Sequence, residues 1–176
     1  VPETRIRLRP GAEARLRDVR TSIKDEGAAG TLYPKTAGAI DGYNLEFSRR
    51  IGAKGWIGIT WPKRCGGQER SFLDRYVVTE EFRVANAPVR AHFTADRQSG
   101  PVLLKYAADE IKKDVLPRIT RGECCFCIGM SEPNSGSDLF AASTKATKTD
   151  QGWRVNGTKL WTSNAHHADY MIGLFR

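Results

Sequence analysis

The hydrophobic pattern of this chain changes its period near Gly122. Upstream of this point, apolar residues recur every three or four positions, which is the spacing of a helix with one buried face. Downstream, apolar residues such as Phe126 and Ile128 alternate with smaller ones, which is the spacing of a strand. We therefore expect an α+β protein, with an N-terminal helical bundle domain over residues 1–120 and the first part of a β domain over residues 121–176.

The expected helices are bounded by residues that cap or break helices. Leu16, Val19 and Ile23 lie on one face of the first helix, which glycines end. The spacing of Leu103, Ala107, Ile111 and Val115 indicates another amphipathic helix. The expected segments are residues 13–26, residues 35–54 closed by Gly55, residues 72–87 between an N-cap at Ser71 and a stop at Pro88, and a helix opened by Pro101 and ended by Pro117.

Residues 55–67 are rich in glycine and contain Trp56, Trp61 and Pro62. Proline and closely spaced glycines interrupt a helix, whereas tryptophan side chains bury a large apolar area. We expect an ordered loop whose tryptophans dock between helices.

The β part is expected to be a meander, the beginning of an antiparallel β-barrel. After a first strand and a polar loop at 131–138, residues 141–149 alternate again. Residues 150–152 indicate a turn, and Asn156-Gly157 is a strong hairpin signal. Residues 168–175 form a last apolar strand with no element to cover its edge, so we expect the sequence to be truncated before a further helical bundle.

The composition excludes several classes of protein. The net charge is +8, but no zinc-finger spacing, RNP-like motif or basic heptad region accompanies it, so we expect no nucleic-acid partner. A substrate that carries phosphates, such as coenzyme A, would also benefit from a positive field. The sequence has no apolar run of the length needed to span a membrane and no signal peptide, so we expect a cytoplasmic protein.

The cysteines and histidines do not suggest a disulfide framework or a metal site. Cys124, Cys125 and Cys127 lie in one expected strand, and reduced thiols are the better interpretation. A metal site needs separated ligands, but His166 and His167 are adjacent and would point to opposite faces of a strand. We expect no metal.

Two polar runs carry the chemistry of the chain. Residues 130–139, MSEPNSGSDL, form a loop of small hydroxylated residues that lets backbone N–H groups approach a polar or anionic ligand. Residues 156–164, NGTKLWTSN, place Trp161 two positions before Ser163. In a strand these two side chains would share one face, with Thr162 on the other. An aromatic surface beside a hydroxyl suits a planar cofactor rich in heteroatoms.

Together these runs resemble the flavin-binding signatures of the acyl-CoA dehydrogenase family. Further segments resemble the family in the same order, and the resemblance covers residues from about 35 to 176. In the signature runs, Ser131 and Ser163 replace the more usual threonines and keep the hydroxyl group, and Asn134 stands where glycine is common. The further matching segments are residues 55–62 with Gly66-Gly67, Glu80-Glu81 with Ala87-Pro88, Gly100-Pro101 and residues 116–123.

The resemblance implies FAD as the cofactor and assigns a role to each site residue. Trp161 would pack on the isoalloxazine ring, and Thr162 and Ser163 would lie beside it, with Ser163 near N5. Ser137 would lie near the pyrophosphate and the pantetheine arm of the substrate. Helical residues at 87–101 would help to wall the acyl pocket. The residues expected to approach the pyrimidine side are Ile128, Met130 and Ser131.

The reaction that the resemblance implies is oxidation of an acyl-CoA thioester to the trans-2-enoyl-CoA, as in fatty-acid β-oxidation. The catalytic glutamate of the family would lie beyond Arg176, and we expect none of the chain's own acids to replace it. The implied partners are electron-transfer flavoprotein as the electron acceptor and further copies of the chain, in a tetramer or dimer. The acids considered and set aside are Glu80, Glu81, Glu110 and Glu132.

Two alternatives stay open. A relative with the same fold could act as an acyl-CoA oxidase or a flavin monooxygenase, and the residue at the position of the base would distinguish these from a dehydrogenase. A truncated chain could also be a non-catalytic binding or assembly module.

Overall fold

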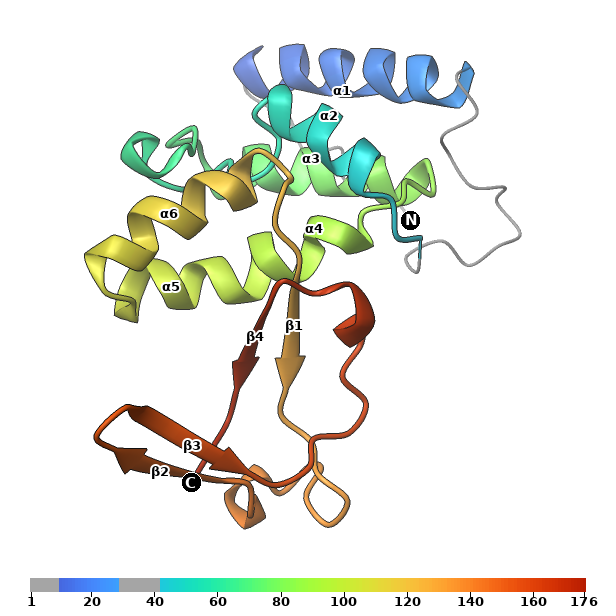
Figure 1. Cartoon of the computed structure of the whole chain (residues 1–176). Helices are drawn as coiled ribbons and strands as arrows, with labels where there is room; N and C mark the ends of the chain where they lie inside the picture. Colours follow the sequence, from blue (N-terminus) through green and yellow to red (C-terminus); the bar gives the residue numbers. More distant parts are fainter. Residues whose placement is uncertain (1–9, 29–41) are drawn as a thin grey trace.

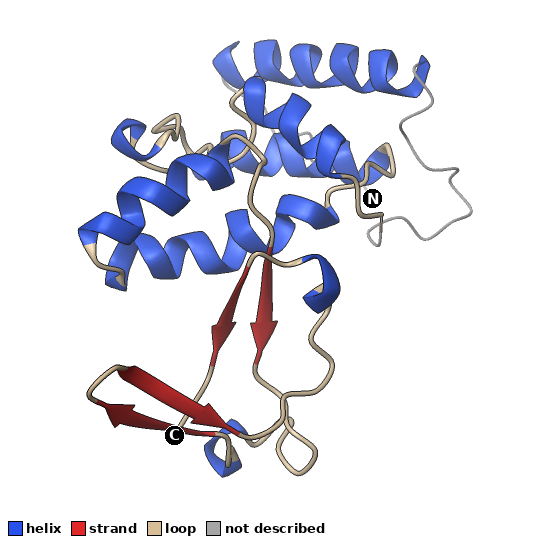
Figure 2. Cartoon of the chain, viewed as in Figure 1, coloured by secondary structure: helices blue, strands red, loops and turns tan. Residues whose placement is uncertain are grey.

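A computed structural model of the chain describes residues 10–28 and 42–176. Helices form one part of the molecule, and the strands extend from it as a second, narrower part (Figures 1 and 2). This arrangement confirms the expected order of a helical domain followed by the start of a β domain. The helices are α1 (Pro10–Ala28), α2 (Leu45–Ala53), α3 (Phe72–Val84), α4 (Arg90–Thr94), α5 (Gly100–Tyr106) and α6 (Asp109–Thr120), with a π-helical turn, η3 (Ala95–Ser99), between α4 and α5.

Helix α3 begins where the sequence predicts, at a capping box formed by Ser71 and Asp74. Ser71 Oγ accepts a hydrogen bond from Asp74 N at 3.2 Å, and Asp74 Oδ2 accepts one from Ser71 N at 3.1 Å. The other carboxylate oxygen of Asp74 accepts from Arg15 Nε of α1 at 2.8 Å. The cap therefore also fixes α1 against α3, and both expected helices are confirmed. The helix expected over 35–54 is observed from Leu45, and residues 29–41 lie outside the described residues.

The helix predicted to run from Pro101 to Pro117 is wrong in two respects. The chain breaks at Ala107 and Ala108, both of which have extended backbone, before Asp109 and Glu110 open α6 in its first turn. The break folds α6 back beside α5. Pro117 lies inside α6, because a helix near its end loses little when one N–H is missing and because Leu116 and Ile119 are anchored in the core.

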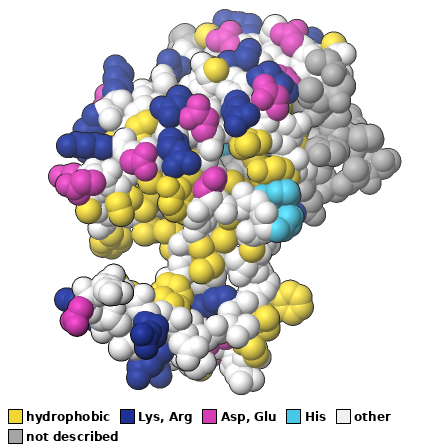
Figure 3. All heavy atoms as spheres, in the orientation of Figure 1, with side chains coloured by type: hydrophobic (Ala, Val, Ile, Leu, Met, Phe, Trp, Pro, Cys, Tyr) yellow, Lys and Arg dark blue, Asp and Glu magenta, His cyan; other side chains and the backbone are white. Residues whose placement is uncertain are grey.

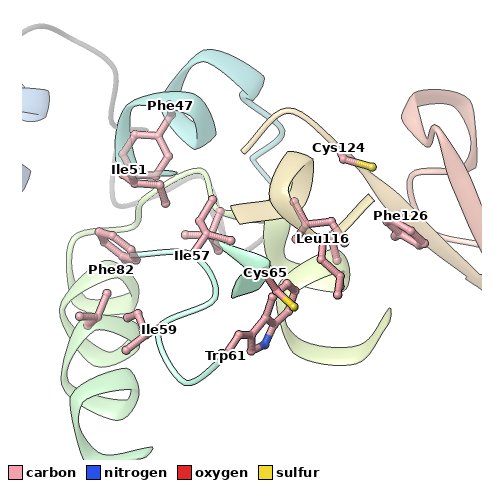
Figure 4. Close-up of a cluster of buried hydrophobic side chains, with 14 of the residues drawn as sticks. Phe47, Ile51, Ile57, Ile59, Trp61, Cys65, Phe82, Leu116, Cys124 and Phe126 are labelled. Carbon is pink, nitrogen blue, oxygen red and sulfur yellow. The ribbon is translucent and has the colours of Figure 1, made fainter. Parts of the chain in front are cut away.

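The helices pack around a core of aromatic and branched side chains, several of which Figure 4 shows converging from different elements. Trp61 is buried in this core, as expected for the loop at 55–67, and Trp56 packs at its edge. A Cβ on Gly100 would lie 2.1 Å from the Trp61 ring, so only glycine allows α5 to approach so closely. The main core members are Phe47, Ile51, Ile57, Ile59, Trp61, Val78, Phe82, Leu116, Ile119, Cys124 and Phe126.

The strands form two separate pairs: β1 (Phe126–Gly129) with β4 (Tyr170–Gly173), and β2 (Lys145–Thr149) with β3 (Gly152–Asn156). The β2–β3 hairpin is antiparallel and turns at residues 150–151, as predicted. The expectation of a continuous antiparallel meander is wrong for β1 and β4, which pair in parallel. A connection of about forty residues between them allows the parallel pairing, which a short hairpin could not.

The prediction of a hairpin turn at Asn156-Gly157 is also wrong. Asn156 is the last residue of β3 and pairs with Lys145, after which the chain leaves the hairpin. Gly157 has a φ of 147°, and a Cβ at this position would lie 2.5 Å from Thr144 Oγ1. The glycine therefore permits a close backbone crossing rather than a two-residue turn.

The described cysteines are all free and buried, in agreement with the expected reduced thiols. Burial raises the pKa of Cys124 to about 12 and that of Cys125 to about 11, so both remain protonated. The backbone N–H of Cys125 donates to Asp169 Oδ2 at 2.8 Å, and its carbonyl accepts from Asp169 N at 2.9 Å. This pair of bonds joins the start of β1 to the start of β4 at the edge of the helical part.

His92 is a buried polar group that makes the helical core sensitive to acid. Its Nδ1 lies 2.9 Å from Ser48 Oγ of α2, and burial, with a smaller contribution from Arg97, lowers its pKa from 6.5 to about 3. Below pH 6.5 the unfolded chain therefore takes up a proton that the folded chain does not. The free energy of unfolding should fall by about 1.4 kcal/mol per pH unit from this group as the pH drops.

Urea unfolding between pH 7 and 5.5 tests this expectation. His92→Gln should remove this part of the slope, while His166→Gln, a substitution of an exposed histidine, should leave it unchanged. Equal slopes for wild type and His92→Gln would contradict the assignment.

Candidate functional site

The loop that follows β1 is closed by a short backbone bridge. Glu132 N donates to Ser135 O at 2.7 Å, and Ser135 N donates to Glu132 O at 3.2 Å. Ser135 Oγ also donates to Asp138 O at 2.7 Å. These bonds join the base of the loop, and Ser137 is exposed at the loop's surface.

The Glu132 side chain lies at the centre of this part of the molecule. Its carboxylate accepts hydrogen bonds from Ser143 N at 2.6 Å, Ser143 Oγ at 2.8 Å and Thr144 N at 3.0 Å. Lys159 Nζ donates to the same carboxylate at 2.7 Å. The hydrogen bond from Lys159, together with those from residues 143 and 144, lowers the pKa of Glu132 far below its usual value. The carboxylate form of Glu132 is therefore favoured, and its oxygens are occupied by donors from residues 143, 144 and 159.

The second polar run is not a strand. Residues 158–162 have no regular structure, and Trp161 has a φ of 56°, in the left-handed region. The expectation that strand alternation sets the faces of Trp161, Thr162 and Ser163 is therefore wrong. Trp161 is 88% exposed, Ser163 is exposed and Thr162 is half-buried. The backbone turns the indole outward without the help of a neighbouring strand.

The structure brings the two runs into direct contact. Leu160 N donates to Ser131 O at 2.8 Å, and Lys159 Nζ donates to Met130 O at 3.1 Å. In Figure 1 the coil that follows β3 runs beside β1 on the side away from β4. Ile128 lies on β1 next to this coil and is half-buried. Of the predicted site residues, the described contacts join Met130 and Ser131 to the Trp161 run but leave Ser137 apart, on its exposed loop.

Lys159, whose side chain joins the two runs, is the contact residue that sequence reasoning missed. It is the one charged residue in the second run, as Glu132 and Asp138 are the only ones in the first. A lone lysine among the neutral residues of the second run, with two acids in the first, was the available signal. Pairing across 27 residues cannot be read from local spacing, so the partner could not be assigned.

The end of the second run reaches back to the helical part. His166 and His167 lie in a 3-10 turn, η5 (Ala165–His167), and not in a strand. The His167 ring stacks on Tyr43, with centroids 3.9 Å apart and an interplanar angle of 13°. Within the described residues no group of three His, Cys, Asp or Glu side chains could hold a metal ion.

The other acids considered in the sequence serve packing or surface roles. Glu81 accepts two hydrogen bonds from the Arg20 guanidinium of α1, each 2.9 Å long. Glu80 accepts from Tyr76 Oη at 3.1 Å. Glu110 lines an apolar hollow of about 470 Å³ between α5, α6 and β4, where Figure 3 shows hydrophobic side chains gathered above the hollow. None of these groups approaches the two runs through a described contact.

The residues at the junction fit a flat ligand with hydrogen-bonding edges. Among the described strands, β1 pairs only with β4, so its other edge faces the coil and offers backbone groups. Trp161 offers an exposed aromatic face, and Ser131, Thr162 and Ser163 offer hydroxyls. A planar ring with nitrogen and oxygen atoms at its rim can stack on the face of Trp161 and form hydrogen bonds with the free edge of β1.

Comparison with known proteins identifies the family. The model of the acyl-CoA dehydrogenase N-terminal domain matches residues 13–123, and that of the acyl-CoA dehydrogenase middle domain matches residues 127–176. The chain belongs to the acyl-CoA dehydrogenase family. The acyl-CoA dehydrogenase FadE26 of Mycobacterium tuberculosis is 36% identical over 155 residues, which are 88% of this chain and 36% of that protein.

Solved structures of family members have the same fold. The ChsE4-ChsE5 complex from Mycobacterium tuberculosis contains a chain with 35% identity and a TM-score of 0.83, over 98% of this chain and 44% of that one. The Tcur3481-Tcur3483 steroid ACAD has 32% identity and a TM-score of 0.83, over 97% and 44%. The chain thus spans less than half the length of these relatives. No helix in the described ranges has both the length and the apolar character needed to cross a membrane.

In this member of the acyl-CoA dehydrogenase family, Gly157 lets the second run cross close to the groups that hold Glu132. Gly157→Ala should lower the free energy of unfolding by about 1–3 kcal/mol, because the added methyl overlaps Thr144 side-chain and backbone atoms at 2.5–2.8 Å. Urea unfolding measures the effect. Gly152→Ala is the matched control, since Gly152 also has a positive φ of 128° but has no atom within 4 Å of the added Cβ. Equal losses in the two variants would show that backbone strain, and not the crossing, sets the cost.

Proposed function

We propose that this chain carries the flavin-contacting N-terminal part of an enzyme that oxidises an acyl-CoA thioester to the trans-2-enoyl-CoA. The observation that carries the proposal is the contact between the two polar runs, made by Leu160 N on Ser131 O and by Lys159 Nζ on Met130 O. This contact leaves the Trp161 face exposed next to a strand edge. Membership of the acyl-CoA dehydrogenase family supports the same assignment.

FAD would be held by residues of both runs. Trp161 would contact the face of the isoalloxazine ring, with Thr162 and Ser163 as hydrogen-bonding neighbours on the N5 side. The β1 edge would offer backbone groups of Ile128 and Met130, and the hydroxyl of Ser131, to the pyrimidine side. When bound, FAD supplies the acceptor for the hydride that leaves the β carbon of the substrate. Ser137, on the exposed loop, would contact the FAD pyrophosphate and the pantetheine arm of the substrate.

The base that removes the α proton is not proposed among the residues of this chain. Glu132 is saturated with hydrogen-bond donors, and Glu81 is paired with Arg20. A base must reach its proton and hold a pKa suited to accepting it. We therefore propose that the catalytic glutamate lies beyond Arg176. An oxidase or monooxygenase reaction on the same fold is the alternative that a different residue at that position would support.

The relatives suggest a class of substrate and a kind of assembly. The Tcur3481-Tcur3483 structure is that of a steroid ACAD, and both it and ChsE4-ChsE5 are complexes of two named chains. We accordingly propose a steroid-derived acyl-CoA as the first substrate class to test and an oligomeric enzyme. The same proposal includes electron-transfer flavoprotein as the electron acceptor and a cytoplasmic location. It also places the boundary between the helical domain and the β domain between residues 120 and 121.

Binding of FAD to the 176-residue chain, which we expect to be weak, tests the cofactor assignment. Trp161→Ala should raise the Kd for FAD roughly fivefold, because aromatic stacking contributes on the order of 1 kcal/mol. It should leave the melting temperature nearly unchanged, since Trp161 is 88% exposed. Titration followed by flavin fluorescence and absorbance gives the Kd.

Trp153→Ala, which removes another exposed tryptophan from β3, is the matched control and should leave the Kd unchanged. A wild-type chain that shows no saturable binding of FAD would overturn the cofactor assignment. Equal affinities in the wild type and Trp161→Ala would remove Trp161 from the site.

Turnover tests the assignment of the base. The 176-residue chain, saturated with FAD, should not reduce an artificial electron acceptor in the presence of acyl-CoA, because Glu132, the buried acid between the two runs, is occupied by hydrogen-bond donors. Addition of a steroid-derived acyl-CoA, octanoyl-CoA and glutaryl-CoA in separate assays covers bulky, straight-chain and acidic substrates. Acyl-CoA-dependent reduction by the chain alone would contradict the proposal that the base lies outside it.

A further inference from the structure

Lys159 and Leu160 together contact three consecutive residues of the first polar run. Its Nζ donates to Met130 O at 3.1 Å and to Glu132 Oε1 at 2.7 Å, while the N–H of the next residue, Leu160, donates to Ser131 O at 2.8 Å. Along Met130, Ser131 and Glu132 the donor is in turn a side chain, a backbone N–H and the same side chain again. A shift of either run by one residue would break all of them, so the contact defines a single register between the runs.

The carboxylate that receives Lys159 is itself held from the other side. Ser143 donates to Glu132 Oε2 through both its N–H and its hydroxyl, and Thr144 N donates to Oε1. The side chains of Lys159 and Glu132 are only 7% and 3% exposed. Neither charge can therefore exchange its partner for bulk water without a local opening of the structure. We use "clasp" for Lys159 and Glu132 together with these donors.

Trp161 has few contacts of its own to hold it in place. It is 88% exposed and its backbone lies in the left-handed region, which is unfavourable for a residue with a Cβ. Its position is set by the backbone on either side: Leu160 N is bonded to Ser131 O, and Ala165 N donates to Thr162 O at 3.2 Å. The clasp is the element that fixes the first of these anchors.

We propose that Lys159 and Glu132 are positioning residues that set Trp161 and the neighbouring hydroxyls in register with the edge of β1. The inference rests on the proposed flavin site and assigns to it two residues whose charged groups are held by other groups of the chain. A pair of apolar side chains could stabilise this region equally well. The charged pair adds a unique geometry, because only one arrangement satisfies every donor and acceptor.

The experiment compares Lys159→Met, Lys159→Arg, Glu132→Gln and the double variant E132Q/K159M in the 176-residue chain. Three quantities are measured in each: the Kd for FAD, the visible circular dichroism of the bound flavin, and the hydrogen-exchange rate of the Leu160 amide relative to the core amide of Ile119. Lys148→Met is the matched control, because Lys148 is exposed on the β2–β3 hairpin.

Lys159→Met should raise the Kd at least tenfold, change the flavin dichroism and speed exchange at Leu160 at least tenfold more than at Ile119. Lys159→Arg should recover most of the affinity, because it restores a cation. Glu132→Gln should raise the Kd for FAD about as much as Lys159→Met does. In the double variant the Kd should rise by less than the product of the two single increases, because no unpaired charge remains buried. Lys148→Met should match the wild type.

Two results would overturn the inference. One is a Lys159→Met chain that melts at a lower temperature but binds FAD with unchanged affinity and dichroism, which would make the clasp merely structural. The other is exchange at Leu160 that rises no more than exchange at Ile119. A wild-type chain that binds no FAD would refute the proposed function, and the exchange rates would still decide whether the clasp sets the register.

Discussion

The β part of this chain depends on one buried carboxylate. Both strands of the β2–β3 hairpin are almost wholly exposed, so the hairpin has little apolar surface to hold it in place. An isolated hairpin is marginal in water. Glu132 fixes the chain just before β2 through the amides of residues 143 and 144, and it fixes the chain after β3 through Lys159. The loop, the hairpin and the second run are thus joined at one ionised group.

The helical part is stabilised in a different way, and the difference shapes the site. Its core is apolar and closely packed, with Trp61 against Gly100 and Leu116 and Ile119 completely buried. Phe126 of β1 belongs to the same core, and Asp169 bonds both backbone groups of Cys125. The first strand therefore extends from a rigid base. Beyond β1, the hydrogen bonds of the clasp hold the two runs in place. An apolar core at the same position would fill the space that the proposed ligand needs.

Local features of the sequence predicted what local physics determines. The N-cap at Ser71, the change of period near Gly122 and the turn at 150–151 are decided within a few residues, and the structure agrees with each. Predictions that depended on distant partners were wrong. Asn156-Gly157 has the dipeptide of a hairpin turn, yet Thr144 determines its conformation. Trp161 sits in an alternating pattern, yet the bond from Leu160 to Ser131 removes it from any strand.

The backbone at Trp161 explains why a polar clasp would suit the proposed ligand site better than apolar packing. Left-handed backbone and an exposed indole are both unfavourable in the free chain. Here folding itself offsets the cost, because the bonds at Leu160 and Thr162 hold the segment before a ligand arrives. A ligand that stacks on the indole then has less conformational entropy to remove, so more of its contact energy appears as affinity. Hydrogen bonds with fixed directions can hold a side chain outward, whereas apolar packing would draw it in.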